Sequence, residues 1–148
     1  FPTRRSSDLI IIMDESGKVV NTTTRDFEIS YPHIGWAEQN PDDWWDGTKE
    51  GIREIIKLSG LKSDEIKGIG FSGQMHGLVL LDKENKVLMP AILWCDQRTQ
   101  EECDYLNNVI GQDKLSKYTA NMALTGFTAP KVYGLKNINQ IYIIKYIR

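Results

Sequence analysis

A glycine-rich segment at the end of an apolar run limits most strongly what this chain can fold into. The run 66–71 predicts a strand, and Gly70-Phe-Ser-Gly-Gln-Met-His-Gly77 overlaps its end. Three glycines at this spacing let the backbone turn sharply and let another group approach closely. The turn contains Gln74, Met75 and His76, so an amide, a thioether and an imidazole share one strand end.

A second polar segment, Trp94-Cys-Asp-Gln-Arg98, ends another apolar run at 87–94. Asp96 stands where a helix over 97–110 would begin, and Arg98 falls in its first turn. In an α/β chain, polar side chains at two strand ends indicate a ligand crevice at the carboxyl edge of the sheet. The alternatives are a tight turn with a solvated histidine, and a helix cap with a surface ion pair for Asp96 and Arg98.

The earlier part of the chain alternates strand and helix patterns. The run 9–14 predicts a buried strand, 14–18 a turn, and 19–30 the returning strand. Asn-Pro-Asp-Asp at 40–43 predicts the start of a helix that Gly60 ends. We interpret its paired tryptophans as core packing. The positions at helical spacing on its buried face are Trp44, Trp45, Thr48, Ile52, Ile55 and Ile56.

The later part of the chain predicts shorter elements. Strands at 78–81 and 87–94 flank Asp82-Lys-Glu-Asn-Lys86, which is typical of a hairpin turn. A short helix at 112–118 follows, and the loop-like segment 119–131 leads into another helix.

Composition excludes several classes of protein. The chain has 148 residues, is 41% hydrophobic and 26% charged, and carries a net charge of −2. This charge gives no electrostatic basis for binding nucleic acid or an anionic membrane. No apolar run reaches the ~20 residues that span a bilayer. Cys95 and Cys103 lack metal-site spacing, so we expect reduced thiols, no metal centre and a cytoplasmic protein.

The two ends of the chain differ in composition from the middle. We interpret residues 1–8 as a translated sequencing adapter, because they show no strand or helix period; the alternative is a disordered basic arm. Residues 133–148 are mostly Ile, Tyr, Asn and Lys, as AT-rich DNA read out of frame would be. Inserting one base after the Val132 codon permits a sequence with a helix period. The alternative is a genuine terminal strand or helix, and the underlying DNA sequence distinguishes the two.

Four segments in order resemble the amino-terminal part of the FGGY carbohydrate kinases. The resemblance covers residues 9–132, and four motifs together are far more specific than any one alone. The Gly-Gln-Met-His-Gly form resembles the branch that phosphorylates D-xylulose rather than glycerol or gluconate. The segments are Gly35-Trp-Ala-Glu-Gln-Asn-Pro-Asp-Asp-Trp-Trp45, Gly68-Ile-Gly-Phe-Ser-Gly-Gln-Met-His-Gly77, Pro90-Ala-Ile-Leu-Trp-Cys-Asp-Gln-Arg-Thr99 and Gly126-Phe-Thr-Ala-Pro-Lys131.

The resemblance implies a fold and a site. The fold would be α/β, an incomplete domain of the ribonuclease H-like, actin-like ATPase class with a mixed sheet and flanking helices. Sugar would bind on this domain, and ATP with Mg²⁺ mostly on a second one. Met75 and His76 would contact D-xylulose, while Gln74 assists or braces the turn. Asp96 and Arg98 would lie near the same crevice.

The resemblance also implies what the chain lacks. A phosphate-binding loop of the Asp-x-Gly-Thr type would stand before residue 9, and the catalytic aspartate and the nucleotide domain would follow residue 148. Phosphoryl transfer needs positioning, metal and a base, so we expect an incomplete kinase that is inactive by itself. The alternatives are a non-catalytic sugar-binding module and a kinase of this family for another ketose or polyol.

Overall fold

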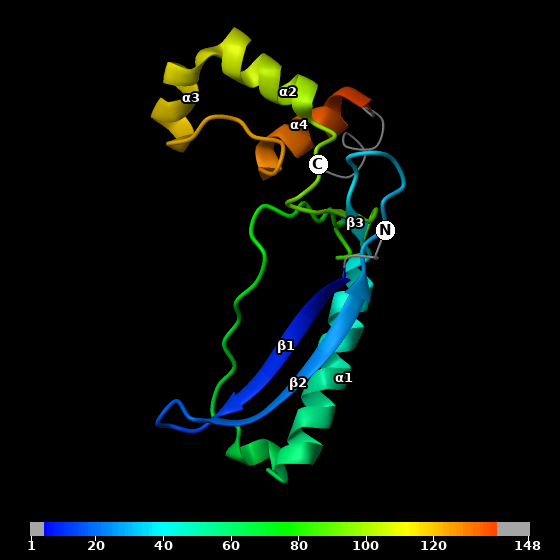
Figure 1. Ribbon diagram of the computed structural model, residues 1–148, viewed down its shortest axis with the longest axis vertical. Coiled ribbons are helices and arrows are strands. Elements are labelled where there is room, and N and C mark those ends of the chain that lie inside the picture. The colour runs from blue at the N-terminus through cyan, green and yellow to red at the C-terminus, as the bar shows by residue number, and fades with distance from the viewer. Residues whose placement is uncertain (1–4, 139–148) are drawn as a thin grey trace. The chain divides into compact units, whose positions relative to one another are not determined.

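The computed structural model describes residues 5–138 of the chain. They form two compact units (Figure 1). The first unit consists of the residues up to Ile29 together with Asn40–Gly73, and the second of Ser30–Gln39 together with the residues from Gln74 onward. All the residues predicted to form the site belong to the second unit.

The first unit is built on an antiparallel hairpin. β1 (Arg5–Met13) pairs with β2 (Val19–Glu28) along their whole length, with one register shift near the turn. In the turn, Gly17 adopts a φ of +84°, and the Asp14 carboxylate accepts backbone N–H bonds from Ser16 and Lys18. The two predicted strands and the turn between them are confirmed.

β1 begins four residues before the predicted strand. Residues 5–8 have no apolar period, yet they continue the ladder, with Ser7 opposite Asp26. Backbone pairing to a partner strand that is already in place requires no side-chain pattern. The pairing does not bear on the origin of these residues, so their interpretation as adapter sequence stays a prediction.

The helix α1 (Pro41–Ser59) packs along the hairpin and has the predicted ends (Figure 1). The Asn40 side chain accepts a bond from the backbone N–H of Asp42, and Gly60 ends the helix in the left-handed conformation. These signals are local, because caps satisfy backbone groups within one turn of the helix end.

The buried residues of α1 are two glycines and an isoleucine rather than tryptophans. Gly47, Gly51 and Ile55 are buried, whereas Trp45 is 64% exposed. A Cβ atom at Gly47 would lie 2.7 Å from the ring of Phe27, so the glycine lets the hairpin approach the helix closely. The prediction of core packing is therefore wrong for Trp45.

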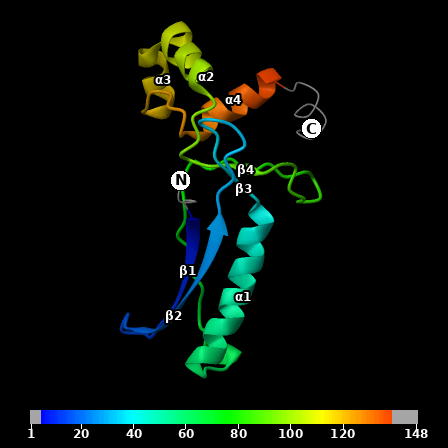
Figure 2. The ribbon, with the colours of Figure 1, turned by 45° about the vertical axis from the view of Figure 1, so that its right-hand side comes forward.

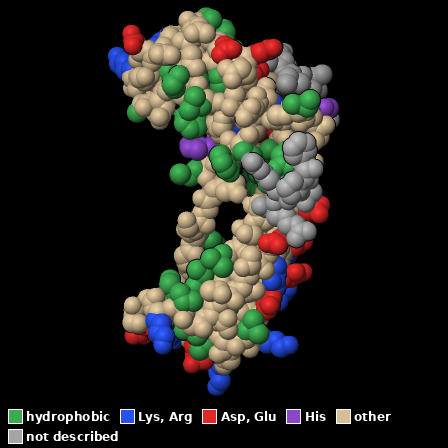
Figure 3. Space-filling model, viewed as in Figure 1, with side chains coloured by type: hydrophobic (Ala, Val, Ile, Leu, Met, Phe, Trp, Pro, Cys, Tyr) green, Lys and Arg blue, Asp and Glu red, His purple; other side chains and the backbone are tan. Residues whose placement is uncertain are grey.

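The first unit ends in a segment that does not pair. After the short 3₁₀ turn η1 (Ser63–Glu65), residues 66–71 form no strand, and Ile69 and Phe71 are exposed. The predicted strand is wrong within the described residues, because a strand needs a neighbouring ladder and none of the strands there pairs with it. Hydrophobic side chains consequently stand on the surface of this unit (Figure 3). The large exposed ones include Leu9, Ile11, Met13, Ile69 and Phe71.

The second unit contains a small sheet. β3 (Glu38–Gln39) pairs antiparallel with β4 (Ala91–Ile92), as Figure 2 shows. Single bridges join Leu78 to Ile92 and Leu81 to Val87. The hairpin turn at 82–86 is confirmed, because the Asp82 carboxylate accepts bonds from two backbone N–H groups of the turn. The predicted strands at 78–81 and 87–94 are too long, because the structure pairs these segments only through the single bridges and through β4.

Four helical segments complete the second unit (Figure 2). They are α2 (Gln100–Asp104), the π-helical η2 (Tyr105–Gly111), α3 (Gln112–Thr119) and α4 (Thr128–Ile138). The predicted helix at 112–118 is confirmed as α3. The helix predicted over 97–110 starts only at Gln100. The first six residues of the segment 133–148 belong to α4, and residues 139–148 lie outside the described part, so the frame-shift interpretation stays a prediction.

No helix among the described residues is both long enough and apolar enough to cross a membrane.

Candidate functional site

The second unit places the five predicted site residues in two different environments. Gln74, Met75 and His76 are exposed in one turn, and the side chain of Met75 is 74% exposed. Asp96 is buried, and the Arg98 side chain is only 8% exposed. The turn therefore presents side chains that can meet a ligand, whereas Asp96 and Arg98 belong to the interior of the unit.

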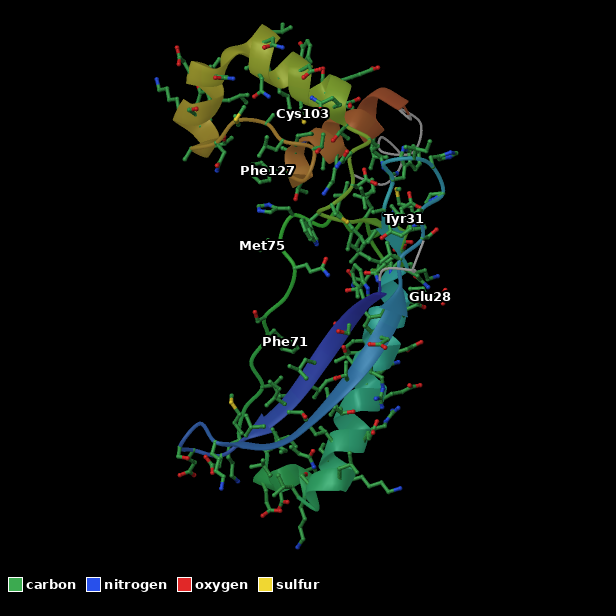
Figure 4. The ribbon with its side chains drawn as sticks, in the orientation of Figure 1. Glu28, Tyr31, Phe71, Met75, Cys103 and Phe127 are labelled. Carbon is green, nitrogen blue, oxygen red and sulfur yellow. The ribbon has the colours of Figure 1, made fainter. Side chains whose placement is uncertain are left out.

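His76 has an unusual backbone conformation. Its φ of +67° falls in the left-handed region, which few residues other than glycine adopt without support. Its imidazole ring lies 4.6 Å from the ring of Phe127, centroid to centroid, and is tilted by 42°. Figure 4 labels Met75 in its loop and Phe127, which immediately precedes α4. The turn is thus an ordered feature.

Lys131, on α4, is a buried residue that binds the backbone of this turn. It is fully buried, and its Nζ atom donates to the carbonyl oxygens of His76 at 2.8 Å and Gly126 at 2.7 Å. Burial lowers the pKa of Lys131, while the carboxylate of Asp96 acts in the opposite direction. Sequence reasoning did not select this residue. The sequence feature that could have indicated a buried lysine was its position in a quoted motif, between an apolar Ala-Pro pair and a valine.

Asp96 and Arg98 form a buried ion pair. Arg98 donates from Nε and Nη2 to the Asp96 carboxylate at 2.8–3.0 Å, and from Nη2 to Glu38 at 2.7 Å. Asp96 also accepts a 2.7 Å bond from the backbone N–H of Ala37. The Arg98 guanidinium stacks 3.6 Å from the centre of the Trp36 ring. The network ties the segment that follows β4, which contains Asp96, to the segment 36–38.

These contacts correct both structural alternatives for the pair. Asp96 does not cap α2, because Thr99 occupies the N-cap position and α2 starts at Gln100. The pair is not a surface ion pair, because the Asp96 side chain is 0% exposed. Sequence reasoning also missed Glu38 and Trp36, which lie about 60 residues away in sequence, although both stand in a quoted motif.

A close backbone approach joins the Trp94 and Gly126 segments. A Cβ atom at Gly126 would lie 2.7 Å from the carbonyl oxygen of Trp94. All four quoted motifs therefore meet in the second unit: the segment 36–38, the His76 turn, the segment from Trp94 to Arg98 and the segment from Gly126 to Lys131. Glycine is required at 126 because a backbone atom cannot move aside as a flexible side chain can.

Three other features offer less support for a functional site: the Cys103 thiol, the side chains of metal-ligating types and the hollow in the first unit. Burial raises the pKa of the Cys103 thiol, which makes that thiol a poor nucleophile. Within residues 5–138, no group of three or more His, Cys, Asp or Glu side chains could hold a metal ion. The first unit has an open hollow of about 420 Å³ with a largely acidic lining, and none of the predicted site residues lines it.

Comparison with known proteins identifies the class to which this architecture belongs. Residues 6–142 match the family model described as the FGGY family of carbohydrate kinases, N-terminal domain. The chain belongs to the FGGY family of carbohydrate kinases. The predicted fold class is confirmed, since the structural neighbours are FGGY sugar kinases with the actin-like ATPase fold.

The more specific similarities are mostly to xylulose kinases. The chain is 41% identical over 126 residues to the xylulose kinase of Bacillus subtilis and 39% identical over 123 residues to that of Escherichia coli K12. These matches cover 85% and 83% of this chain but only 25% of each relative. The chain thus spans about a quarter of the length of the curated relatives it matches.

Solved structures show the same relationship. A xyloylose kinase from Brucella ovis superposes with a TM-score of 0.84 at 34% identity, over 93% of this chain and 28% of that one. Plasmodium falciparum glycerol kinase with ADP gives a TM-score of 0.85 at 25% identity, over 94% of this chain and 28% of that one.

Proposed function

We propose that this chain forms one wall of the sugar site of a cytoplasmic xylulokinase. The whole enzyme would transfer the γ-phosphoryl group of ATP to a hydroxyl of D-xylulose, giving ADP and D-xylulose 5-phosphate. The observation that carries the proposal is the ordered turn that presents Met75 and His76 on the surface of the second unit. Seven xylulose kinases that are 37–41% identical to the chain support the choice of sugar.

In this proposal the turn holds and orients the sugar. The imidazole of His76 can donate to or accept from a hydroxyl group, and the thioether of Met75 can pack against C–H groups of the sugar. Gln74 adds an amide beside them. Asp96 and Arg98 stabilise the segment after β4 from the interior, because their charged groups are already engaged by protein partners.

ATP and Mg²⁺ belong to the whole enzyme in this proposal. When bound, the metal would neutralise charge on the phosphate oxygens during transfer. The part of the chain that the structure describes offers no cluster of ligands that fits a metal ion, so we assign no step of phosphoryl transfer to these residues. Their share of the mechanism is to bind the sugar and orient its hydroxyl groups.

His76→Ala is expected to raise the Kd of the chain for D-xylulose about tenfold, because one hydrogen bond to a sugar hydroxyl and one ring contact are lost. Titration calorimetry of the 148-residue chain with D-xylulose measures the change. His33→Ala is the matched control, since His33 is also exposed and also packs against an aromatic ring. Equal affinities of the wild type and His76→Ala would remove His76 from the sugar contacts.

The 148-residue chain alone is expected to show no ATP-dependent phosphorylation of D-xylulose, because its described residues supply no metal site for the transfer. A coupled assay of ADP release measures this, with the Bacillus subtilis enzyme as the positive control. Turnover by the chain would contradict the expectation. A chimera with residues 9–132 in place of the matched segment of that enzyme separates a kinase fragment, which should sustain turnover, from a binding module.

A further inference from the structure

We propose that Lys131 is a positioning residue for the sugar site, which holds the turn at Met75 and His76 in the conformation that presents both side chains. The proposal rests on the proposed function and adds a residue that does not itself reach the surface. Lys131 acts through His76, whose carbonyl it binds.

The contacts of Lys131 tie two separate segments together. Its Nζ atom donates to the carbonyl of His76, 55 residues earlier, and to the carbonyl of Gly126, five residues earlier. An ammonium group has three N–H donors, and these two bonds use two of them. Because Lys131 is fully buried, water does not reach its side chain to replace these two bonds.

The backbone of His76 needs such support. A histidine in the left-handed region persists only where its surroundings hold it there. The segment that contains Phe127 and Lys131 holds His76 at two points: Lys131 binds its carbonyl, and Phe127 packs against its ring. Lys131 is anchored in turn by its place on α4, next to the buried Pro130.

The surroundings of Lys131 act on its charge in both directions, and the two bonds that its Nζ atom donates are what the geometry shows. Burial lowers the pKa of Lys131, and the nearby Asp96 carboxylate favours the ammonium form, while the Arg98 guanidinium opposes it. A residue that merely filled space could be replaced by methionine without effect. A positioning residue could not, because methionine has nearly the same shape but no N–H donor.

The test is Lys131→Met in the 148-residue chain. We expect the NMR coupling between the amide proton and Hα of His76, which reports its φ, to lose its wild-type value, and the Kd for D-xylulose to rise about tenfold. Resonances of the first unit should stay unchanged. Lys136→Met, which removes an exposed lysine of the same helix, is the matched control and should change neither quantity. An unchanged His76 coupling and an unchanged Kd would overturn the proposal.

Two further outcomes separate this proposal from the proposed function. If the wild type does not bind D-xylulose, the proposed function fails, and the His76 coupling alone decides whether Lys131 holds the turn. If Lys131→Met does not fold, Lys131→Arg, which keeps the cation and its donors, is measured instead. A retained His76 coupling in Lys131→Arg supports the proposal, and an altered one overturns it.

Discussion

Asp96→Asn is expected to lower the free energy of unfolding by about 3–5 kcal/mol, the range for breaking a buried ion pair by removing one partner. The asparagine amide would direct its N–H groups at the Arg98 guanidinium or at the backbone N–H of Ala37, both of which are donors. Arg98 would keep only Glu38 as a charged partner among the contacts described above. Urea denaturation followed by tryptophan fluorescence measures the loss.

Asp46→Asn is the matched control for this variant. Asp46 also pairs with a cation, Lys49, but the Asp46 side chain is 66% exposed and the pair lies one turn apart on α1. Exposed pairs of this kind contribute about 0.2–1 kcal/mol, so its loss should be small. Equal losses in the two variants would contradict the view that burial of the Asp96 network makes it important.

Gly126→Ala is expected to destabilise the chain by about 1–3 kcal/mol, the cost of overpacking a site that cannot relax easily. The added methyl group would lie 2.7 Å from the carbonyl oxygen of Trp94, so one of the two segments must move. Movement of Gly126 would also displace its carbonyl from Lys131. Thermal unfolding measures the loss of stability, and D-xylulose titration should show a weaker affinity.

Gly68→Ala should have the opposite effect on stability. A Cβ atom there would meet nothing within 4 Å, and the backbone of Gly68 does not require a positive φ. Replacing glycine by alanine at such a position restricts the unfolded chain and stabilises by about 0.4–1 kcal/mol. If Gly126→Ala proved as stable as Gly68→Ala, the close approach of Gly126 to Trp94 would not affect the free energy of unfolding.

Local signals in the sequence predicted the hairpin and the ends of α1 in the first unit. The caps of α1 and the turn at Gly17 depend on neighbouring residues, and the structure has both where the sequence placed them. The strand at 66–71 depends instead on a partner elsewhere in the chain, and its apolar pattern contains no information about whether that partner is there. The apolar spacing of α1 also did not indicate that glycines, rather than Trp45, face the hairpin.

Sequence reasoning selected the exposed turn and the buried Asp96 and Arg98 as site candidates, but it did not select the buried partners of these residues. Both the turn with Met75 and His76 and Lys131 stand in quoted motifs, but the motif of Lys131 does not show that its side chain is buried. Its burial follows from packing between segments that are 55 residues apart. The same reason explains why Glu38 was missed, because its partner Arg98 lies 60 residues away in sequence.

The long separation of these contacts has a consequence for the order in which the chain folds. Contacts between distant residues form late, because the intervening loop must be closed before they contribute. A ribosome adds about 5–20 residues per second, so the His76 turn leaves it roughly 3–11 seconds before Lys131, 55 residues later, can bind to it. During synthesis α1 can form from local signals alone. The turn at Met75 and His76 has to wait for α4, and we expect it to be among the last parts of the described chain to reach its final conformation.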